Sequence, residues 1–87
     1  MSNSDLFQGY KGKALDVLMK FNVRVWGQTE METTRGTFTG TVLPRSINDD
    51  AEHIVIKVIT GYNIGVDVNT IINMKETGYK KANYAIP

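Results

Sequence analysis

The sequence predicts a mainly β fold, in which a single N-terminal α-helix precedes a small barrel of five short strands. Three observations predict it. Only one segment, close to the N-terminus, places apolar residues at helical spacing. Beyond residue 22, apolar residues recur with a period of two, in short segments about ten residues apart. Glycine, proline and acidic residues separate these segments. Closing the sheet would remove exposed strand edges from a chain that is too short to cover them otherwise.

The length of 87 residues allows one domain and leaves no room for a second. The helix is predicted from Ala14, Leu15 and Leu18, which share one face. Gly9 and Gly12 weaken its first half, so the prediction is firmest from residue 12 onward. We expect the single domain 1–87 to divide into a loose leader over 1–9, a helix over 10–21, the barrel over 22–75 and a tail over 76–87.

The strands follow in order along the chain. Residues 28–34 are polar and are predicted to form a hairpin loop. Gly40 lies inside an expected strand, where glycine marks a bulge or the bend of a small barrel. Pro44 ends that strand because proline cannot donate to the ladder. The segments expected to be strands are 23–26, 36–43, 53–59, 64–68 and 71–74, the last as a strand or as a helical turn followed by one.

The composition excludes several classes of function. No cysteine is present, which excludes disulfides, thiolate metal sites and cysteine nucleophiles. His53 is the single histidine, so multi-histidine metal sites and most catalytic triads are excluded too. No apolar run is long enough to span a membrane, and the N-terminus lacks the apolar segment of a signal peptide. We expect a cytoplasmic module without catalytic residues, metal ion or cofactor.

Charge is nearly balanced, at +1, which by itself does not indicate a nucleic-acid-binding protein. Its distribution leaves two interpretations open. The N-terminal basic residues form a face that contacts phosphate, or they are ordinary solvated charges. Against Asp16 alone, this segment carries Lys11, Lys13, Lys20 and Arg24.

The segment Gly61–Gly65 is a candidate for both structure and binding. Gly61 and Asn63 tolerate the left-handed conformation, and Gly65 lets another group approach closely. The same turn would present Tyr62 as a stacking platform and Asn63 as a polar contact. A structural turn and a binding surface are compatible, because a rigid turn presents side chains well.

Arg45 follows a proline that ends a strand, and we expect it to be exposed. It is a candidate to bind phosphate or an acidic partner surface. The alternative is an ion pair with Asp49 and Asp50 in the acidic turn that follows. That turn, which also holds Glu52, lacks the ligand spacing of a calcium loop.

Three motifs carry a resemblance to a known family. They are Leu43-Pro44-Arg45, the strand from His53 to Val58, and Gly61-Tyr62-Asn63-Ile64-Gly65. In this order, over residues 10–75, the chain resembles the N-terminal domain of the D subunit of the archaeal glutamyl-tRNA(Gln) amidotransferase. The resemblance implies a small SH3-like barrel that sits ahead of an asparaginase-like catalytic domain, which releases ammonia to amidate misacylated tRNA.

The chain departs from that family at two places. Thr33-Thr34 lacks the flanking glycines of the T-G-G-T-type motif that holds the threonine nucleophiles, so the resemblance does not carry amidotransferase activity. Phe21-Asn22 stands where the family usually has Gly-Asp. The resemblance therefore implies a fold and a setting in translation rather than a reaction.

A second resemblance is to the Sm-like family, which also places a helix on a five-stranded barrel. Residues 60–64 are similar to its I-R-G-x-N-I motif, although Thr60 occupies the arginine position. In that family the motif joins the last two strands, whereas 23 residues follow Ile64 here.

Together these observations predict a non-enzymatic, translation-related docking module whose partner is a protein or a tRNA. A protein is favoured because +1 is little charge for a dedicated RNA-binding protein. Exposed apolar residues such as Val55 and Ile59 would then make the contact. Two alternatives remain open: an RNA-binding small barrel that uses the basic segment 9–24 with Tyr62, and a homo-oligomer formed by strand pairing at a barrel edge.

Overall fold

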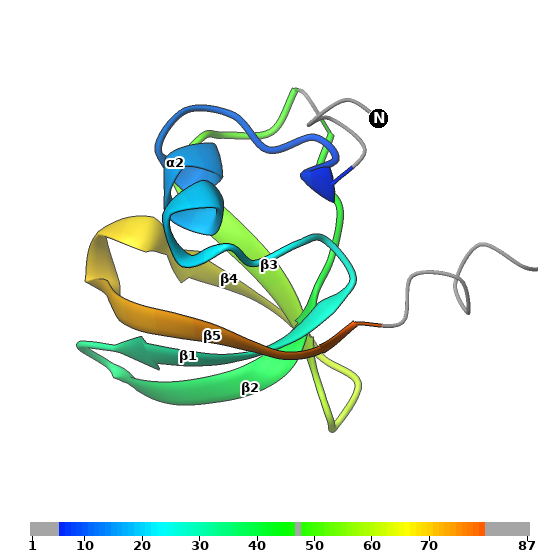
Figure 1. The fold of residues 1–87 in the computed structure, drawn as a ribbon, viewed down its shortest axis with the longest axis vertical. Helices are drawn as coiled ribbons and strands as arrows, with labels where there is room; N and C mark the ends of the chain where they lie inside the picture. The colour runs from blue at the N-terminus through cyan, green and yellow to red at the C-terminus, as the bar shows by residue number, and fades with distance from the viewer. Residues whose placement is uncertain (1–5, 47, 80–87) are drawn as a thin grey trace, which may run out of the picture.

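A computed structural model describes residues 6–46 and 48–79 of the chain. It confirms the predicted fold class, a mainly β domain with one N-terminal helix and five antiparallel strands in a single sheet (Figure 1). The strand order is β4-β3-β2-β1-β5. The elements are α2 (Gly12–Phe21), β1 (Gly27–Thr33), β2 (Gly36–Val42), β3 (His53–Val58), β4 (Asn63–Asp67), the 3₁₀ turn η1 (Val68–Thr70) and β5 (Ile71–Tyr79).

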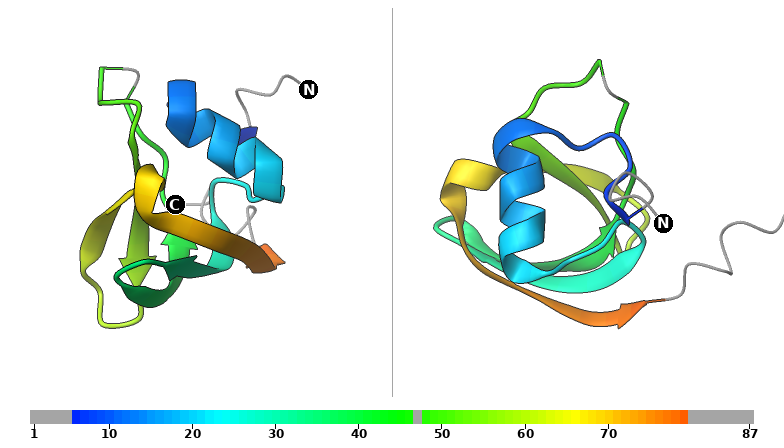
Figure 2. Two further views of the ribbon diagram at one scale, coloured as in Figure 1. Left: turned by 90° about the vertical axis from the view of Figure 1, so that its left-hand side faces the viewer. Right: turned by 45° about the horizontal axis from the view of Figure 1, so that its top comes forward.

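The sheet curls around one core but is not closed by hydrogen bonds. Its outermost strands, β4 and β5, are joined by η1 and do not pair with each other. Figure 2 shows the curled sheet from two further sides, with α2 covering one of its openings. The sheet is therefore barrel-like in its curl but is open between β4 and β5, so full closure of the barrel is not observed. The largest fully buried side chains are Leu18, Met31, Ile54, Ile56, Val23, Val25, Val42 and Thr29.

The helix has the bounds for which the sequence pattern was strongest. It begins at Gly12 rather than at residue 10, because Gly9 and Gly12 adopt positive φ angles of 82° and 58°. Ala14 and Leu18 form the buried face of the helix. It ends at Phe21 and is capped by Asn22, whose left-handed conformation directs its backbone N–H to the last carbonyls of the helix.

The predictions for residues 23–34 are wrong. Residues 23–26 form a turn instead of a strand, because Trp26 has a φ of 73° and the N–H of Gly27 donates to the carbonyl of Arg24. The segment predicted as a loop is β1, the central strand between β2 and β5. Its burial alternates strictly, with Thr29 and Met31 facing the core. The buried Thr29 hydroxyl donates to the carbonyl of Gly27 at 3.2 Å.

The last strand is longer than predicted. The strand predicted at 71–74 is confirmed as the start of β5, whereas Val68, which was expected to end the preceding strand, begins the 3₁₀ turn η1. However, β5 continues to Tyr79, so residues 76–79, which we assigned to the tail, pair with β1. The remainder of that tail and most of the leader lie outside the described residues.

Glycine is required at Gly40 because two backbones approach each other there. Gly40 pairs with Thr29 of β1 and with Val58 of β3, and the pairing of β2 with β3 begins at this residue. A Cβ placed on Gly40 would lie 2.6 Å from the carbonyl oxygen of Lys57. The predicted bend is therefore a close contact that only glycine allows.

A substitution at Gly61, in the β3–β4 turn, measures the cost of backbone strain without any steric clash. Gly61 has a φ of 97°, as predicted, and a Cβ there would meet nothing within 4 Å. Gly61→Val is expected to lower the free energy of unfolding by about 1–2 kcal/mol, because a β-branched residue is strained at positive φ. Urea unfolding measures the change. Gly65→Val is the control, since Gly65 is equally open but has no positive φ; equal losses in both variants would contradict the turn geometry.

Candidate functional site

Arg45 is held inside the acidic turn instead of projecting into solvent. Its side chain is only 12% exposed. The guanidinium donates to Asp49 at 3.1 Å and to the carbonyl of His53 at 3.1 Å, and lies 3.5 Å from Asp50. The predicted exposure of Arg45 is wrong, and the alternative, an ion pair with the acidic turn, is confirmed. The Arg45 guanidinium therefore uses several of its N–H groups to stabilise the acidic turn.

The acidic turn is ordered by its own hydrogen bonds. The backbone N–H of Glu52 and the ring of His53 both contact the Asp50 carboxylate, and together they lower the pKa of Asp50 to about 2. The pKa of Asp49 is also lowered, first by the backbone N–H of Ser46 and then by Arg45. The turn therefore carries fixed negative charge. Within residues 6–46 and 48–79, no group of three histidine or acidic residues could hold a metal ion.

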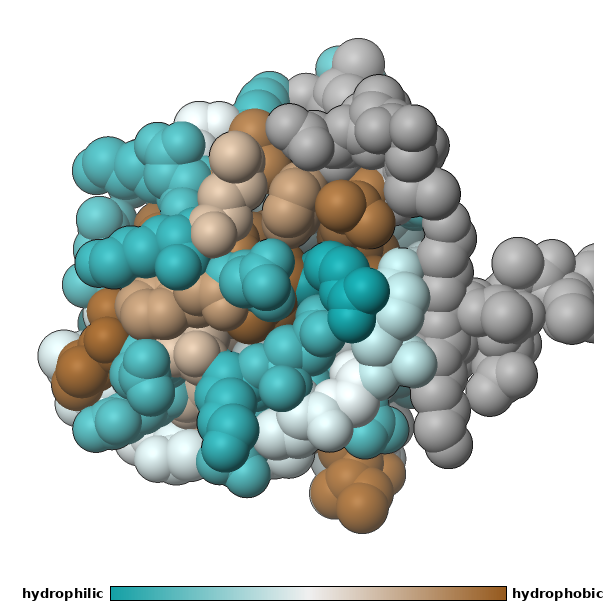
Figure 3. Space-filling model, in the orientation of Figure 1, coloured by the Kyte–Doolittle hydropathy of each residue, from teal (hydrophilic) through white to brown (hydrophobic). Residues whose placement is uncertain are grey.

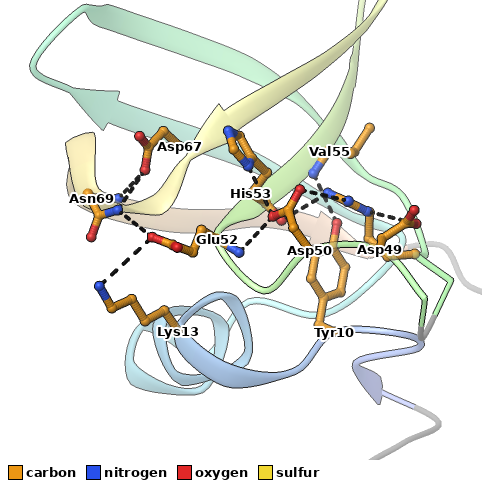
Figure 4. A network of polar contacts seen from close by, with 10 residues as sticks. Tyr10, Lys13, Asp49, Asp50, Glu52, His53, Val55, Asp67 and Asn69 are labelled. Carbon is orange, nitrogen blue, oxygen red and sulfur yellow. Dashed lines mark hydrogen bonds and ion pairs between the residues drawn. The ribbon is translucent and has the colours of Figure 1, made fainter.

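A second part of this network connects the helix to the sheet. Lys13 lies 3.9 Å from Glu52, and the same carboxylate accepts a hydrogen bond from Asn69 at 3.0 Å (Figure 4). Asn69 also donates to Asp67. Both ends of the Lys13 pair are exposed, so it contributes little to stability.

The Arg24 side chain is bound by Glu76 and Tyr79, two residues that sequence analysis did not identify as its partners. It is therefore not available to the basic face that was one interpretation of the sequence. Its guanidinium makes two hydrogen bonds to Glu76, at 3.2 and 2.6 Å, and lies 3.6 Å from the centre of the Tyr79 ring. Its backbone N–H donates to the same carboxylate. Burial acts to raise the pKa of Glu76, but the hydrogen bonds and charge of Arg24 outweigh it, so this pKa lies below its usual value.

The other basic candidates lie on or beside α2. Lys11 precedes the helix, and Lys20 lies in its last turn with its ammonium 5.3 Å from the centre of the Phe21 ring. All three lysines, Lys11, Lys13 and Lys20, are exposed. The structure thus leaves three lysines near the helix, whereas the guanidinium of Arg24 is paired with Glu76 of β5.

The most exposed apolar side chains lie at the tip of the β3–β4 hairpin. Ile59 is fully exposed and Tyr62 is 74% exposed. The tip is rigid, because the N–H of Gly61 donates to the carbonyl of Val58, and the N–H of Val58 donates to the carbonyl of Tyr62. The hairpin projects at the lower right of Figure 1, and the same place in Figure 3 carries a protruding apolar patch. We call Ile59 and Tyr62 the hairpin tip.

The remaining candidates of this hairpin lie beside the acidic turn. Asn63 begins β4 and is exposed, and it does not use the left-handed conformation that asparagine tolerates. A Cβ on Gly65 would meet nothing within 4 Å, so close approach does not explain this glycine. A shallow hollow on the sheet brings Asn63 and Gly65 near Arg45. The β3–β4 turn and α2 lie on opposite sides of the molecule (Figure 1).

Comparison with known proteins places the chain in a family. The family model described as the GatD N-terminal domain matches residues 28–75, which span β1 to most of β5.

None of the helices in the described residues is long and apolar enough to cross a membrane.

Curated relatives agree with this match. The D subunit of the glutamyl-tRNA(Gln) amidotransferase of Sulfurisphaera tokodaii is 37% identical over 81 residues, which cover 93% of this chain and 18% of that protein. Its counterpart in Methanopyrus kandleri is 37% identical over 70 residues, covering 79% and 15%. That of Methanococcus maripaludis is 47% identical over 53 residues, covering 59% and 12%. The chain thus spans less than a fifth of these relatives, and it belongs to the GatD N-terminal domain family.

Proposed function

We propose that the chain is a non-enzymatic docking module that binds a protein partner in or near translation. The setting comes from its relatives, which are named as subunits of a glutamyl-tRNA(Gln) amidotransferase. The match leaves out more than four fifths of those proteins. In the chain itself, Thr33 is buried and its hydroxyl donates to the carbonyl of Gly36 at 2.7 Å. A threonine in that position supports the β1–β2 turn and is a poor nucleophile.

The hairpin tip is the observation that supports a protein partner. A fully exposed isoleucine beside an exposed tyrosine gives an anchor of the kind that protein interfaces bury at their centres. Both lie on a turn whose hydrogen bonds fix its shape, so little conformational entropy is lost on binding. Lys57, which is also exposed near the tip, adds one positive charge.

RNA binding is the second candidate, and it depends on the helix lysines. Two of the arginines that would contribute are already bound: Arg24 to Glu76 and Arg45 to Asp49. Three lysines would release few counterions, so we expect weak, strongly salt-dependent affinity for tRNA.

Substitution at the hairpin tip tests the docking proposal. Ile59→Ser is expected to reduce capture of the partner protein from native lysate at least tenfold, because an exposed anchor is lost. Ile72→Ser is the matched control, since Ile72 is 55% exposed on β5. Neither change should alter the melting temperature by more than a few degrees, as neither side chain is buried. Equal capture by both variants would contradict the proposal.

A titration with tRNA separates the two candidates. If docking is correct, tRNA leaves the amide signals of residues 11–24 and 61–65 unchanged in NMR spectra. Shifts on those residues that vanish as salt rises, and that are abolished by Lys11→Glu combined with Lys13→Glu, would favour RNA binding instead.

A further inference from the structure

The outer edge of β4 is open. β4 is the last strand on its side of the sheet, next to β3 only. The left view of Figure 2 shows it at the margin of the molecule. Proteins usually protect such an edge with lysine, proline or a bulge. β4 has none of these: its five residues, Asn63–Asp67, pair with β3 without a register shift and hold one charge, at Asp67.

The hydrogen-bond pattern shows which backbone groups face outward. The N–H of Val58 donates to the carbonyl of Tyr62, and the N–H of Val68 donates to that of Glu52, so even-numbered residues of this strand bond to β3. Groups alternate along an antiparallel strand. The N–H and C=O groups of the odd-numbered residues therefore point away from the sheet; these residues are Asn63, Gly65 and Asp67.

These outward groups lack partners within the described part of the chain, with one exception. No hydrogen bond joins the backbone of Asn63 or Gly65 to another described residue, whereas the carbonyl of Asp67 accepts one from the Thr70 hydroxyl at 2.7 Å. Space is available beside them. A Cβ on Gly65 would meet nothing within 4 Å. A cleft of about 280 Å³ runs along residues 64–67 and separates them from Thr33, Arg35 and Phe38 of the β1–β2 hairpin.

The order of residues along β4 is symmetric about Gly65. A polar residue lies at each end, an apolar residue follows inward on each side, and glycine occupies the centre. If a second β4 pairs antiparallel about this glycine, Gly65 faces Gly65 of the other copy, and Ile64 faces Val66. Asn63 of one copy then faces Asp67 of the other, where its amide can donate to the carboxylate.

We propose that β4 pairs with β4 of a second copy of this chain, antiparallel and centred on Gly65. Outward residues form hydrogen-bonded pairs in this register, and each pair exchanges two backbone hydrogen bonds. The contact is isologous, so it closes at a dimer and does not extend into a fibre. The opposite edge is a poorer template, because β5 has two register shifts against β1 and contacts α2. This inference does not depend on the docking proposal.

A pair of substitutions at Gly65 tests the backbone pairing. We expect the protein to dimerise as its concentration rises from about 10 µM to about 1 mM in sedimentation equilibrium. Gly65→Pro removes the outward N–H, which β3 does not use, and should weaken dimerisation at least tenfold. Gly65→Ala keeps that N–H and should leave the dimer intact. Circular dichroism checks that both variants fold.

Substitutions at Asn63 test the register. Asn63→Asp sets a second carboxylate opposite Asp67 and should weaken the dimer severalfold, whereas Asn63→Lys should strengthen it. A chain that stays monomeric throughout overturns the proposal, as does a dimer that ignores Gly65→Pro or responds alike to both Asn63 variants. A foreign protein that binds the edge of a monomeric chain, and is lost with Gly65→Pro, also overturns it. Ile59→Ser should leave dimerisation unchanged.

Discussion

Gly9→Ala is expected to lower the free energy of unfolding by about 3 kcal/mol. Gly9 has a φ of 82°, and a Cβ there would overlap the carbonyl oxygen of Arg45. The contact cannot simply open, because the N–H of Arg45 donates to the carbonyl of Gln8 at 3.0 Å. Buried side chains lie on both sides of Gly9, at Phe7 and Tyr10, so a backbone shift would also disturb the core. Urea unfolding followed by circular dichroism measures the loss.

Gly36→Ala is the matched control for this prediction. Gly36 has a φ of 125°, so alanine is strained there as well, but a Cβ would meet nothing within 4 Å. Its expected cost is about 1 kcal/mol, from backbone strain alone. Equal costs at the two positions would show that the close packing of residues 8–10 against Arg45 contributes nothing to stability.

The sequence was sufficient to predict elements that are defined by local patterns. The helix was predicted from its apolar face, and β3 from its run of isoleucine and valine. β1 was missed because its inward positions, Thr29 and Thr33, are polar and looked like loop residues. Their hydroxyls are satisfied by nearby carbonyls, which makes burial tolerable in a way that composition does not show.

The candidate site was predictable only where neighbours in sequence determine exposure. The turn at Gly61 directs Ile59 and Tyr62 outward, and the turn itself was predicted. Arg24 was misjudged because its partner, Glu76, is 52 residues away and was assigned to the tail. The exposure of Arg45 was misjudged although its partners are close in sequence. Its hydrogen bond to the carbonyl of His53 forms only because the acidic turn brings His53 back to Arg45.

Tyr10 joins the N-terminal segment to the sheet through a buried hydroxyl. That hydroxyl donates to the carbonyl of Leu43 at 2.8 Å. It also accepts from the N–H of Val55 at 3.0 Å (Figure 4). Burial raises the pKa of Tyr10 to about 12, and the hydrogen bond from Val55 opposes this only in part. The folded state therefore favours the neutral phenol, because a phenolate would have to be buried at the same place.

The ionisation of Tyr10 should make the free energy of unfolding fall at alkaline pH. In the unfolded chain the phenol ionises with its ordinary pKa of 10, below the value of about 12 in the folded protein. The stabilising contribution is complete below pH 10 and is lost as the pH rises from 10 toward 12. The loss is on the order of 2–3 kcal/mol, the equivalent of a shift of about two pKa units. Urea unfolding at a series of pH values measures it.

Tyr10→Phe separates this contribution from the lysines, which titrate in the same range. Without the hydroxyl, the N–H of Val55 loses its partner, so the variant should be about 1–3 kcal/mol less stable at neutral pH. Between pH 10 and 12 its stability should fall less steeply than that of the parent protein, because no buried phenol remains to ionise. Parallel pH profiles for the two proteins would mean that the Tyr10 phenol ionises equally easily in the folded and unfolded states. Such a result would contradict the burial of its hydroxyl between Leu43 and Val55.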